Sequence, residues 1–113
     1  MLTRHECRDR RLGRVVAIHG RTGVASEELR KLGFSCRDVS GRMADGGPGH
    51  VVPHAWVVPK ARWDNDAVLR AEVALVMARH NPTPLDELAR LQRAVKEAMM
   101  AGTEAHPTGE AKR

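Results

Sequence analysis

The chain has very few aromatic residues and cysteines. Its 113 residues include one phenylalanine, two tryptophans and no tyrosine, so aliphatic and methionine side chains must fill most of any core. This shortage favours closely packed small helices over a β-sandwich, whose core would need larger side chains. The two cysteines, Cys7 and Cys36, form no CxxC motif, which argues against a disulfide scaffold and against a redox site.

Long apolar runs and an N-terminal signal segment are also missing. No run approaches the roughly 18 apolar residues that a membrane-spanning helix needs. The opening sequence MLTRHECRDRRLGR has no apolar signal core. We therefore expect a cytoplasmic protein without a membrane partner, built as one domain with an appended helical unit.

Positive charge is distributed unevenly along the chain. Residues 1–44 contain ten basic and five acidic residues, a net charge of +5, whereas residues 45–80 and 81–113 are each neutral. Nine of those ten basic residues are arginines, whose planar guanidinium matches phosphate and guanine. A basic cluster of this kind favours a nucleic-acid partner over a merely solvated surface.

The first half of the chain is interpreted as three helices. Thr3 and Glu6 fit a capping box and predict a helix over residues 4–19. A second helix is predicted over residues 26–33, where Gly33 ends it. The third is predicted over residues 35–44, with its arginines facing outward.

The second half is interpreted as one extended segment followed by two helices. The Val-rich sequence HVVPHAWVVP at 50–59 predicts a strand or small hairpin, in which Pro53 must lie where no ladder hydrogen bond is needed. Helices are predicted over residues 65–80 and 84–102, separated by the helix-stopping Asn-Pro pair.

The order of these elements resembles a winged helix-turn-helix. The sequence AIHGRTGVASEELRKLGFSCRDVSGRMADG, followed by GPGHVVPHAWVV, is similar to the N-terminal domain of AbiEi-type antitoxins and related transcriptional regulators. The matching positions are Gly20, Ser26, Leu29, Leu32, Gly33, Phe34, Ser35, Val39, Met43, Gly46 and Trp56.

This resemblance implies a mainly α fold with a small β-hairpin, divided into three parts. Residues 1–60 would form the winged helix-turn-helix, residues 61–101 a helical hairpin, and residues 102–113 a flexible tail. The implied function is that of a sequence-specific double-stranded DNA-binding protein, a repressor-like transcriptional regulator associated with the nucleoid. Neither enzymatic activity nor a cofactor is expected.

The resemblance also assigns the DNA contacts. The second helix of such a motif enters the major groove, so its side chains would reach base edges while preceding basic residues contact phosphates. The predicted DNA-binding residues are Ser35, Arg37, Asp38, Ser40, Arg42, Arg30, Lys31, Arg21, Arg14 and His50.

An apolar stripe on the last helix suggests a homodimer. Specific regulators of this kind commonly bind paired half-sites as dimers. The predicted dimerisation residues are Leu85, Leu88, Leu91, Val95 and Met99. The same stripe could instead fold back on the helix at 65–80 within one chain.

Three other readings compete with DNA binding. Histidines His5, His19, His50 and His54 with the two cysteines could ligate zinc, but their spacing fits no known finger, so no metal is predicted. Residues 23–43 faintly resemble the end of a rhodanese-type sulfurtransferase, yet His19 stands where that family has its catalytic cysteine. The strongest competitor is a module that docks its basic face on an acidic protein, because His50 and His54 replace the usual basic wing residues.

Overall fold

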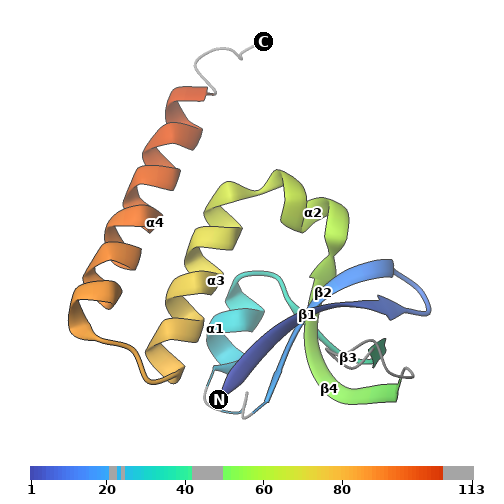
Figure 1. Ribbon diagram of the computed structural model, residues 1–113. Coiled ribbons are helices and arrows are strands. Elements are labelled where there is room, and N and C mark those ends of the chain that lie inside the picture. The colour runs from blue at the N-terminus through green and yellow to red at the C-terminus, as the bar shows by residue number, and fades with distance from the viewer. Residues whose placement is uncertain (21–22, 24, 42–49, 106–113) are drawn as a thin grey trace. The chain divides into compact units, whose positions relative to one another are not determined.

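The computed structural model describes residues 1–20, 23, 25–41 and 50–105. The chain forms two compact units, residues 1–65 and residues 66–113, which we call the barrel unit and the helical unit. The first contains strands β1 (Leu2–Asp9), β2 (Gly13–Gly20), β3 (Ser35–Gly41) and β4 (His50–Pro59), with helices α1 (Ser26–Lys31) and α2 (Lys60–Asn65). The second contains α3 (Ala67–His80) and α4 (Leu85–Ala105) (Figure 1).

The four strands close into an antiparallel barrel in the order β1-β2-β4-β3. Strands β1 and β2 form a hairpin whose register pairs Cys7 with Val15, and β2 pairs in turn with β4. The ring closes where β1 meets β3, at the pair Arg8 and Ser40. The closed order gives every strand two neighbours, which limits pairing of the sheet edges with other chains.

The barrel interior is packed with small apolar side chains. Residues on alternate positions of each strand share a face, and the inward set is buried. Its members are Cys7, Val15, Ala17, Val39, Val52, Ala55 and Val57. Because none of these side chains is aromatic, the low aromatic content of the sequence suits a narrow four-stranded barrel.

The outer face of β2 and β4 is also apolar. Val16 pairs with Val58 and Ile18 pairs with Trp56 on this face, and all four side chains are buried. Helix α2 follows β4 directly and contacts both strands, and its Trp63 is only 9% exposed. Strand β2 is therefore buried on both faces, which explains its continuous apolar run VVAI.

Strand β4 contains a bulge at Pro53 and His54. Val39 pairs with Val52 and Arg37 pairs with Ala55, so two residues of β4 lie opposite the single residue Asp38. His54 has a φ of 56°, in the left-handed region, and its backbone N–H donates to Asp38 Oδ1 at 3.0 Å. The bulge places Pro53 where no ladder hydrogen bond is required, as predicted from the sequence.

Helix α1 and the turn after it match the sequence prediction. Leu29 is fully buried, and the helix ends before Gly33, whose φ of 98° suits glycine. The Arg62 guanidinium lies against this turn and donates to the carbonyl oxygen of Leu32 at 2.7 Å. Helix α1 thus connects β2 to β3 and is tied to α2 by one side chain.

The helical unit is an antiparallel pair of helices (Figure 1). Asp66 caps α3 by accepting a hydrogen bond from the Leu69 backbone N–H at 2.9 Å. Helix α3 buries one stripe, Leu69, Val73 and Val76, and it contacts α4 along its length. The alternative in which the last helix folds back on its predecessor within one chain is therefore observed.

The predicted winged helix-turn-helix is wrong, because the N-terminal half forms a closed β-barrel followed by helices. Residues 4–19 form the β1–β2 hairpin instead of a helix. Residues 35–41 form strand β3 instead of the start of a recognition helix, and residues 42–44 lie outside the described residues. In both segments cross-strand pairing and burial outweigh a weak helical spacing of apolar residues.

Candidate nucleic-acid interface

The tip of the β1–β2 hairpin is held in shape by Asp9. Its Oδ1 accepts hydrogen bonds from the backbone N–H groups of Arg11 and Leu12, at 2.8 and 2.9 Å. Gly13 follows with a φ of 74° and returns the chain into β2. An aspartate that bonds the backbone two and three residues onward is a local turn device, so the tip has a defined backbone conformation.

The second carboxylate oxygen of Asp9 is bound by Arg37. The Nε of Arg37 donates to Asp9 Oδ2 across the barrel, from β3 to β1. The Asp9 side chain is 2% exposed and that of Arg37 is 30% exposed. The hydrogen bond from Arg37, helped by those from Leu12 and Arg11, lowers the pKa of Asp9 to about 2. Asp9 is therefore ionised at neutral pH, and the Arg37 guanidinium is engaged in the ion pair with it.

Three other arginines surround this tip and have no acidic partner among the residues that the structure describes. Arg8 ends the exposed side of β1, while Arg10 and Arg11 form the turn, and all three are exposed. Leu12 beside them is 42% exposed. The hairpin thus presents three available guanidinium groups on a rigid support.

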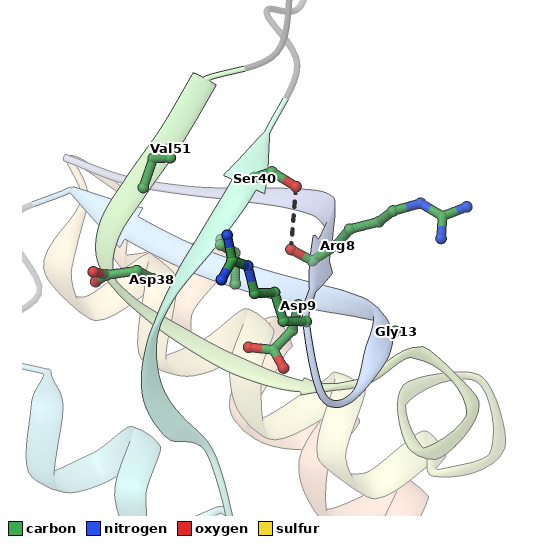
Figure 2. A pocket seen from close by; sticks show the side chains of 8 residues that line it. Arg8, Asp9, Gly13, Asp38, Ser40 and Val51 are labelled. Carbon is green, nitrogen blue, oxygen red and sulfur yellow. Dashed lines mark hydrogen bonds between the residues drawn. The ribbon is translucent and has the colours of Figure 1, made fainter.

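A surface hollow of ≈ 720 Å³ adjoins the hairpin. Its wall is made by the hairpin, β3 and the start of β4, through Arg8, Asp9, Arg10, Gly13, Asp38, Val39, Ser40 and Val51. In Figure 2 the side chains of Arg8 and Asp38 project in opposite directions, and the Ser40 hydroxyl donates to the Arg8 carbonyl oxygen at 3.4 Å. Asp38 therefore does not neutralise Arg8.

The other arginines that the structure describes in the barrel unit are engaged in the fold. The guanidinium of Arg4 lies over the Trp63 ring at 5.1 Å, and that of Arg30 lies over the Trp56 ring at 5.7 Å. These cation–π contacts help to cover the two tryptophans. Together with the Arg62 contact to the α1 turn, they leave the hairpin tip as the part of the described barrel richest in available positive charge.

Arg14 belongs to a surface network of ion pairs. Its Nη2 lies 3.0 Å from Glu6 Oε1, and Lys60 Nζ lies 3.6 Å from Glu6 Oε2. Lys60 also bonds Asp64 at 2.6 Å, and that hydrogen bond is the main reason why the pKa of Lys60 is raised. Arg14 is still well exposed, so it can serve as a secondary contact beside the tip.

The structure disperses the residues predicted to bind DNA. Ser35, Arg37, Asp38 and Ser40 lie on β3, where Ser35 is exposed, Arg37 is bound by Asp9, Asp38 holds the β4 bulge and Ser40 bonds Arg8. Arg30 and Lys31 are exposed on α1. His50 begins β4, and Arg21 and Arg42 lie outside the described residues. Among the described members of this set, Ser40, Asp38, Arg14 and Arg37 come near the hairpin and its hollow, and Arg37 is bound by Asp9 there.

Sequence reasoning did not select Arg8, Arg10 and Arg11 as a group because it predicted a helix over residues 4–19 and took the DNA contacts from the predicted recognition helix and its neighbours. A signal for the correct structure was available. Asp9 and Gly13 bracket a short polar segment, and a run of β-branched residues follows at Val15, Val16 and Ile18. That pattern is typical of a hairpin turn followed by a buried strand.

The histidine and cysteine side chains that the structure describes do not assemble into a metal centre. The rings of His5 and His19 stack at 4.5 Å between centroids, and His19 Nε2 lies 3.2 Å from Thr3 Oγ1. Within the described residues, no group of three or more possible metal ligands gathers. Burial raises the pKa of the Cys7 thiol, while Cys36 is exposed on β3.

Net charge follows the division into units. The barrel unit contains twelve basic and seven acidic residues, a net charge of +5, and the helical unit contains seven of each. Among the described helices, none is both long and apolar enough to cross a membrane. All of the excess positive charge thus belongs to the unit that carries the arginine hairpin.

No protein-family model, curated protein or solved structure matches this chain. The resemblance to AbiEi-type antitoxin domains therefore finds no support from these comparisons, and the barrel contradicts the fold that it implied. What the chain can bind has to be argued from its own surface.

Proposed function

We propose that the barrel unit binds double-stranded DNA through the tip of the β1–β2 hairpin. The observation that carries this proposal is the exposure of Arg8, Arg10 and Arg11, without acidic partners in the described part of the chain, on a turn fixed by Asp9. A rigid turn loses little conformational freedom on binding, so its guanidinium groups can engage phosphates at low entropic cost.

The geometry favours a backbone-contacting ribbon. The major groove of B-DNA admits a two-stranded β-ribbon, and several DNA-binding proteins use strands in this way. Arginines at the tip would bond phosphates or the O6 and N7 of guanine, and Arg14 would extend the contact along the hairpin. Most of the affinity would come from phosphate contacts and would fall steeply as salt rises.

Duplex DNA is a better candidate than a single strand. Proteins that bind single strands usually stack bases on exposed aromatic side chains. Here Phe34, Trp56 and Trp63 are 3%, 7% and 9% exposed, and the chain has no tyrosine. The barrel therefore offers arginines for a phosphate backbone and no tryptophan or phenylalanine face for bases.

Transcriptional regulation was predicted together with a recognition helix. Residues 35–41 are a strand, so the element expected to read the sequence is not present there. We retain duplex DNA as the partner and assign the contact to the hairpin, with weak sequence preference. Docking of the same arginines on an acidic protein is the alternative that the experiment below separates.

The test measures binding of the full chain to a fluorescently labelled duplex by anisotropy across a salt series starting near 50 mM, where non-specific binding is strongest. The key variant is Arg10→Gln with Arg11→Gln. Its matched control, Arg79→Gln with Arg90→Gln, removes the same two charges from the helical unit. We expect the hairpin variant to bind DNA more weakly than the wild type. The negative slope of log K against log salt should become less steep by about one for each lost phosphate contact.

Two results would overturn the proposal. The wild-type chain could fail to bind duplex DNA even at low salt, and the acidic-protein alternative would then take its place. Equally, the hairpin variant could bind as tightly as the wild type while the helical-unit control loses affinity. A single-stranded oligonucleotide competitor checks the preference for duplex.

A further inference from the structure

Helix α4 carries a seam that its own unit covers only in part. Its positions Leu85, Leu88, Gln92, Val95 and Met99 are spaced by three and four residues alternately. This is the a and d pattern of a coiled coil over two heptads. Leu85 is 83% exposed and Met99 is 46% exposed, while Gln92 is exposed and Leu88 and Val95 are half-buried.

A groove lies beside this seam within the helical unit. It has a volume of ≈ 410 Å³ and is bounded by one residue of α3 and five of α4, namely Leu75, Ala89, Gln92, Arg93, Val95 and Lys96. The groove runs past Gln92, at the middle of the seam. An incoming helix would therefore contact both α3 and α4, which suits a bundle better than a pair of isolated helices.

From these features we infer that the helical unit pairs with a second copy of itself through an antiparallel contact of the two α4 helices, centred on Gln92. The positions of the seam are symmetric about this residue. Leu85 of one chain would meet Met99 of the second copy, and Leu88 would meet Val95. An isologous twofold contact requires this kind of self-complementary surface.

Charge and hydrogen bonding favour the antiparallel arrangement. On the groove side of the seam, Asp86 lies near the start of α4 and Lys96 lies towards its end. Antiparallel pairing places the two groove sides next to each other and brings Asp86 of one chain towards Lys96 of the second copy, whereas parallel pairing would place the two groove sides on opposite sides of the contact. The two Gln92 amides can donate to and accept from each other across the twofold axis.

The electrostatic surroundings do not oppose self-association. The helical unit contains seven basic and seven acidic residues, so two copies do not repel each other through net charge. On the helix surface away from the seam, Arg90 forms a two-bond contact with Glu87 at 2.6 and 2.7 Å. These charged groups satisfy each other, which leaves the apolar seam as the part of α4 that a partner would cover.

The proposed seam differs by one residue from the dimerisation set predicted from the sequence. The predicted dimerisation set contained Leu91, which is half-buried, in place of Gln92. At 100° per residue, Leu91 lies outside the narrow stripe that joins Leu85 to Met99. The inference concerns the helical unit alone, so it stands or falls separately from DNA binding.

The test measures the mass of the full chain in solution by sedimentation equilibrium at micromolar concentrations. We expect the wild type to have the mass of two 12.5 kDa chains. Gln92→Glu places two carboxylates face to face at the twofold axis and should weaken association at least about tenfold at neutral pH. Association should recover at about pH 4, where the new carboxylates become protonated.

A matched pair of methionine variants locates the seam. Met99→Glu introduces a charge at a seam position and should give single chains, whereas Met100→Glu, at the neighbouring position outside the seam, should leave the pair intact. Circular dichroism of each variant checks that the helices remain folded. As a second readout, Gln92→Cys in a Cys36→Ser background should form a disulfide-linked pair on oxidation, and Glu97→Cys should not.

A single-chain mass for the wild type throughout this concentration range would overturn the inference. So would equal association constants for Met99→Glu and Met100→Glu in folded proteins, because the seam would then not be the contact. Cross-linking at Glu97→Cys in place of Gln92→Cys would contradict the register centred on Gln92.

Discussion

Asp9 and Arg37 form an ion pair that joins β1 to β3, the two strands at which the barrel closes. The backbone register across this junction pairs Arg8 with Ser40. The Ser40 hydroxyl also donates to the Arg8 carbonyl oxygen, so side-chain bonds contribute to the closure of the barrel. The same carboxylate holds the turn at Arg11 and Leu12. One buried aspartate thus connects the integrity of the barrel to the shape of the proposed DNA-binding tip.

Stability should depend on the ionisation of Asp9. The folded-state pKa of about 2 is below the ordinary value of 3.8, so the charged form stabilises the fold above about pH 4 and this contribution is lost as pH falls towards 2. We expect Asp9→Asn to be less stable than the wild type at neutral pH and to show a flatter pH dependence between these values. Urea unfolding at several pH values measures both effects.

The control for Asp9 is Glu6→Gln, which removes an exposed ion-pair partner of Arg14. Surface pairs contribute less than about 1 kcal/mol, so this variant should stay close to the wild type. Parallel pH profiles for the wild type and Asp9→Asn would show that the buried pair does not control closure.

The barrel interior should reject a larger side chain at Ala17. This residue is fully buried between Cys7, Val15 and Val57 in the inner cluster. Ala17→Leu should lower the free energy of unfolding by about 1–3 kcal/mol because the interior is already filled. The matched variant Ala101→Leu, at an exposed position of α4, should change it by less than about 0.5 kcal/mol. A neutral or stabilising Ala17→Leu would contradict the closed barrel.

The turn after α1 should require glycine at position 33 for two separable reasons. Gly33 has a φ of 98°, and a Cβ atom there would overlap the Arg62 guanidinium. We expect Gly33→Ala to cost about 1–3 kcal/mol. Gly13→Ala has positive φ but no atom near its Cβ, so it measures the backbone component alone.

Combining Gly33→Ala with Arg62→Ala should recover part of the loss, since the steric conflict disappears. Thermal unfolding of the single and double variants gives the coupling directly. Strict additivity of the two substitutions would show that Arg62 moves aside at no cost.

Asp38 should behave as a structural residue and not as a base contact. Its Oδ1 accepts a hydrogen bond from the His54 N–H and so supports the bulge in β4. Asp38→Ala should lower the free energy of unfolding by about 0.5–1.5 kcal/mol. The same variant should not weaken duplex binding, measured by anisotropy on several sequences. A change in sequence preference would restore the role predicted from the sequence.

The parts of the fold that were predicted correctly have strong local signals. The helix near residues 84–102 has apolar periodicity between Pro84 and Gly102, the helix near 26–33 ends at Gly33, and the apolar helix near 65–80 ends before Pro82. The extended segment at 50–59 is Val-rich and is bounded by Gly49 and Pro59. Each of these signals depends only on the residues of its own segment, so it predicts the conformation of that segment without knowledge of the tertiary fold.

The barrel itself could not be recognised from such signals. Strand β3 exposes Ser35 and Cys36 and buries only Val39 and Gly41, so its sequence carries little β character of its own. Its conformation depends on pairing with β4, whose partner residues lie 9 to 22 positions later in the chain, and the bulge there shifts the alternation by one residue. Long-range pairing of this kind leaves no periodic trace in a short segment.

The predicted arrangement of the DNA-binding residues was wrong for a related reason. Arg37 was chosen because it would lie outward on a recognition helix, but in the barrel it faces inward and meets Asp9. A buried carboxylate 28 positions away is not visible in the sequence around Arg37. The positive charge of the N-terminal segment was recognised correctly from composition, whereas its distribution over the surface required the fold.

The most direct test of the account is an NMR titration of the full chain, labelled with ¹⁵N, with a short DNA duplex at low salt. We predict that the amide signals of residues 8–14 shift first and furthest, with smaller changes along β1 and β2. The account is contradicted if these signals stay in place while amides of α3 or α4 move, or if saturating duplex changes no signal at all.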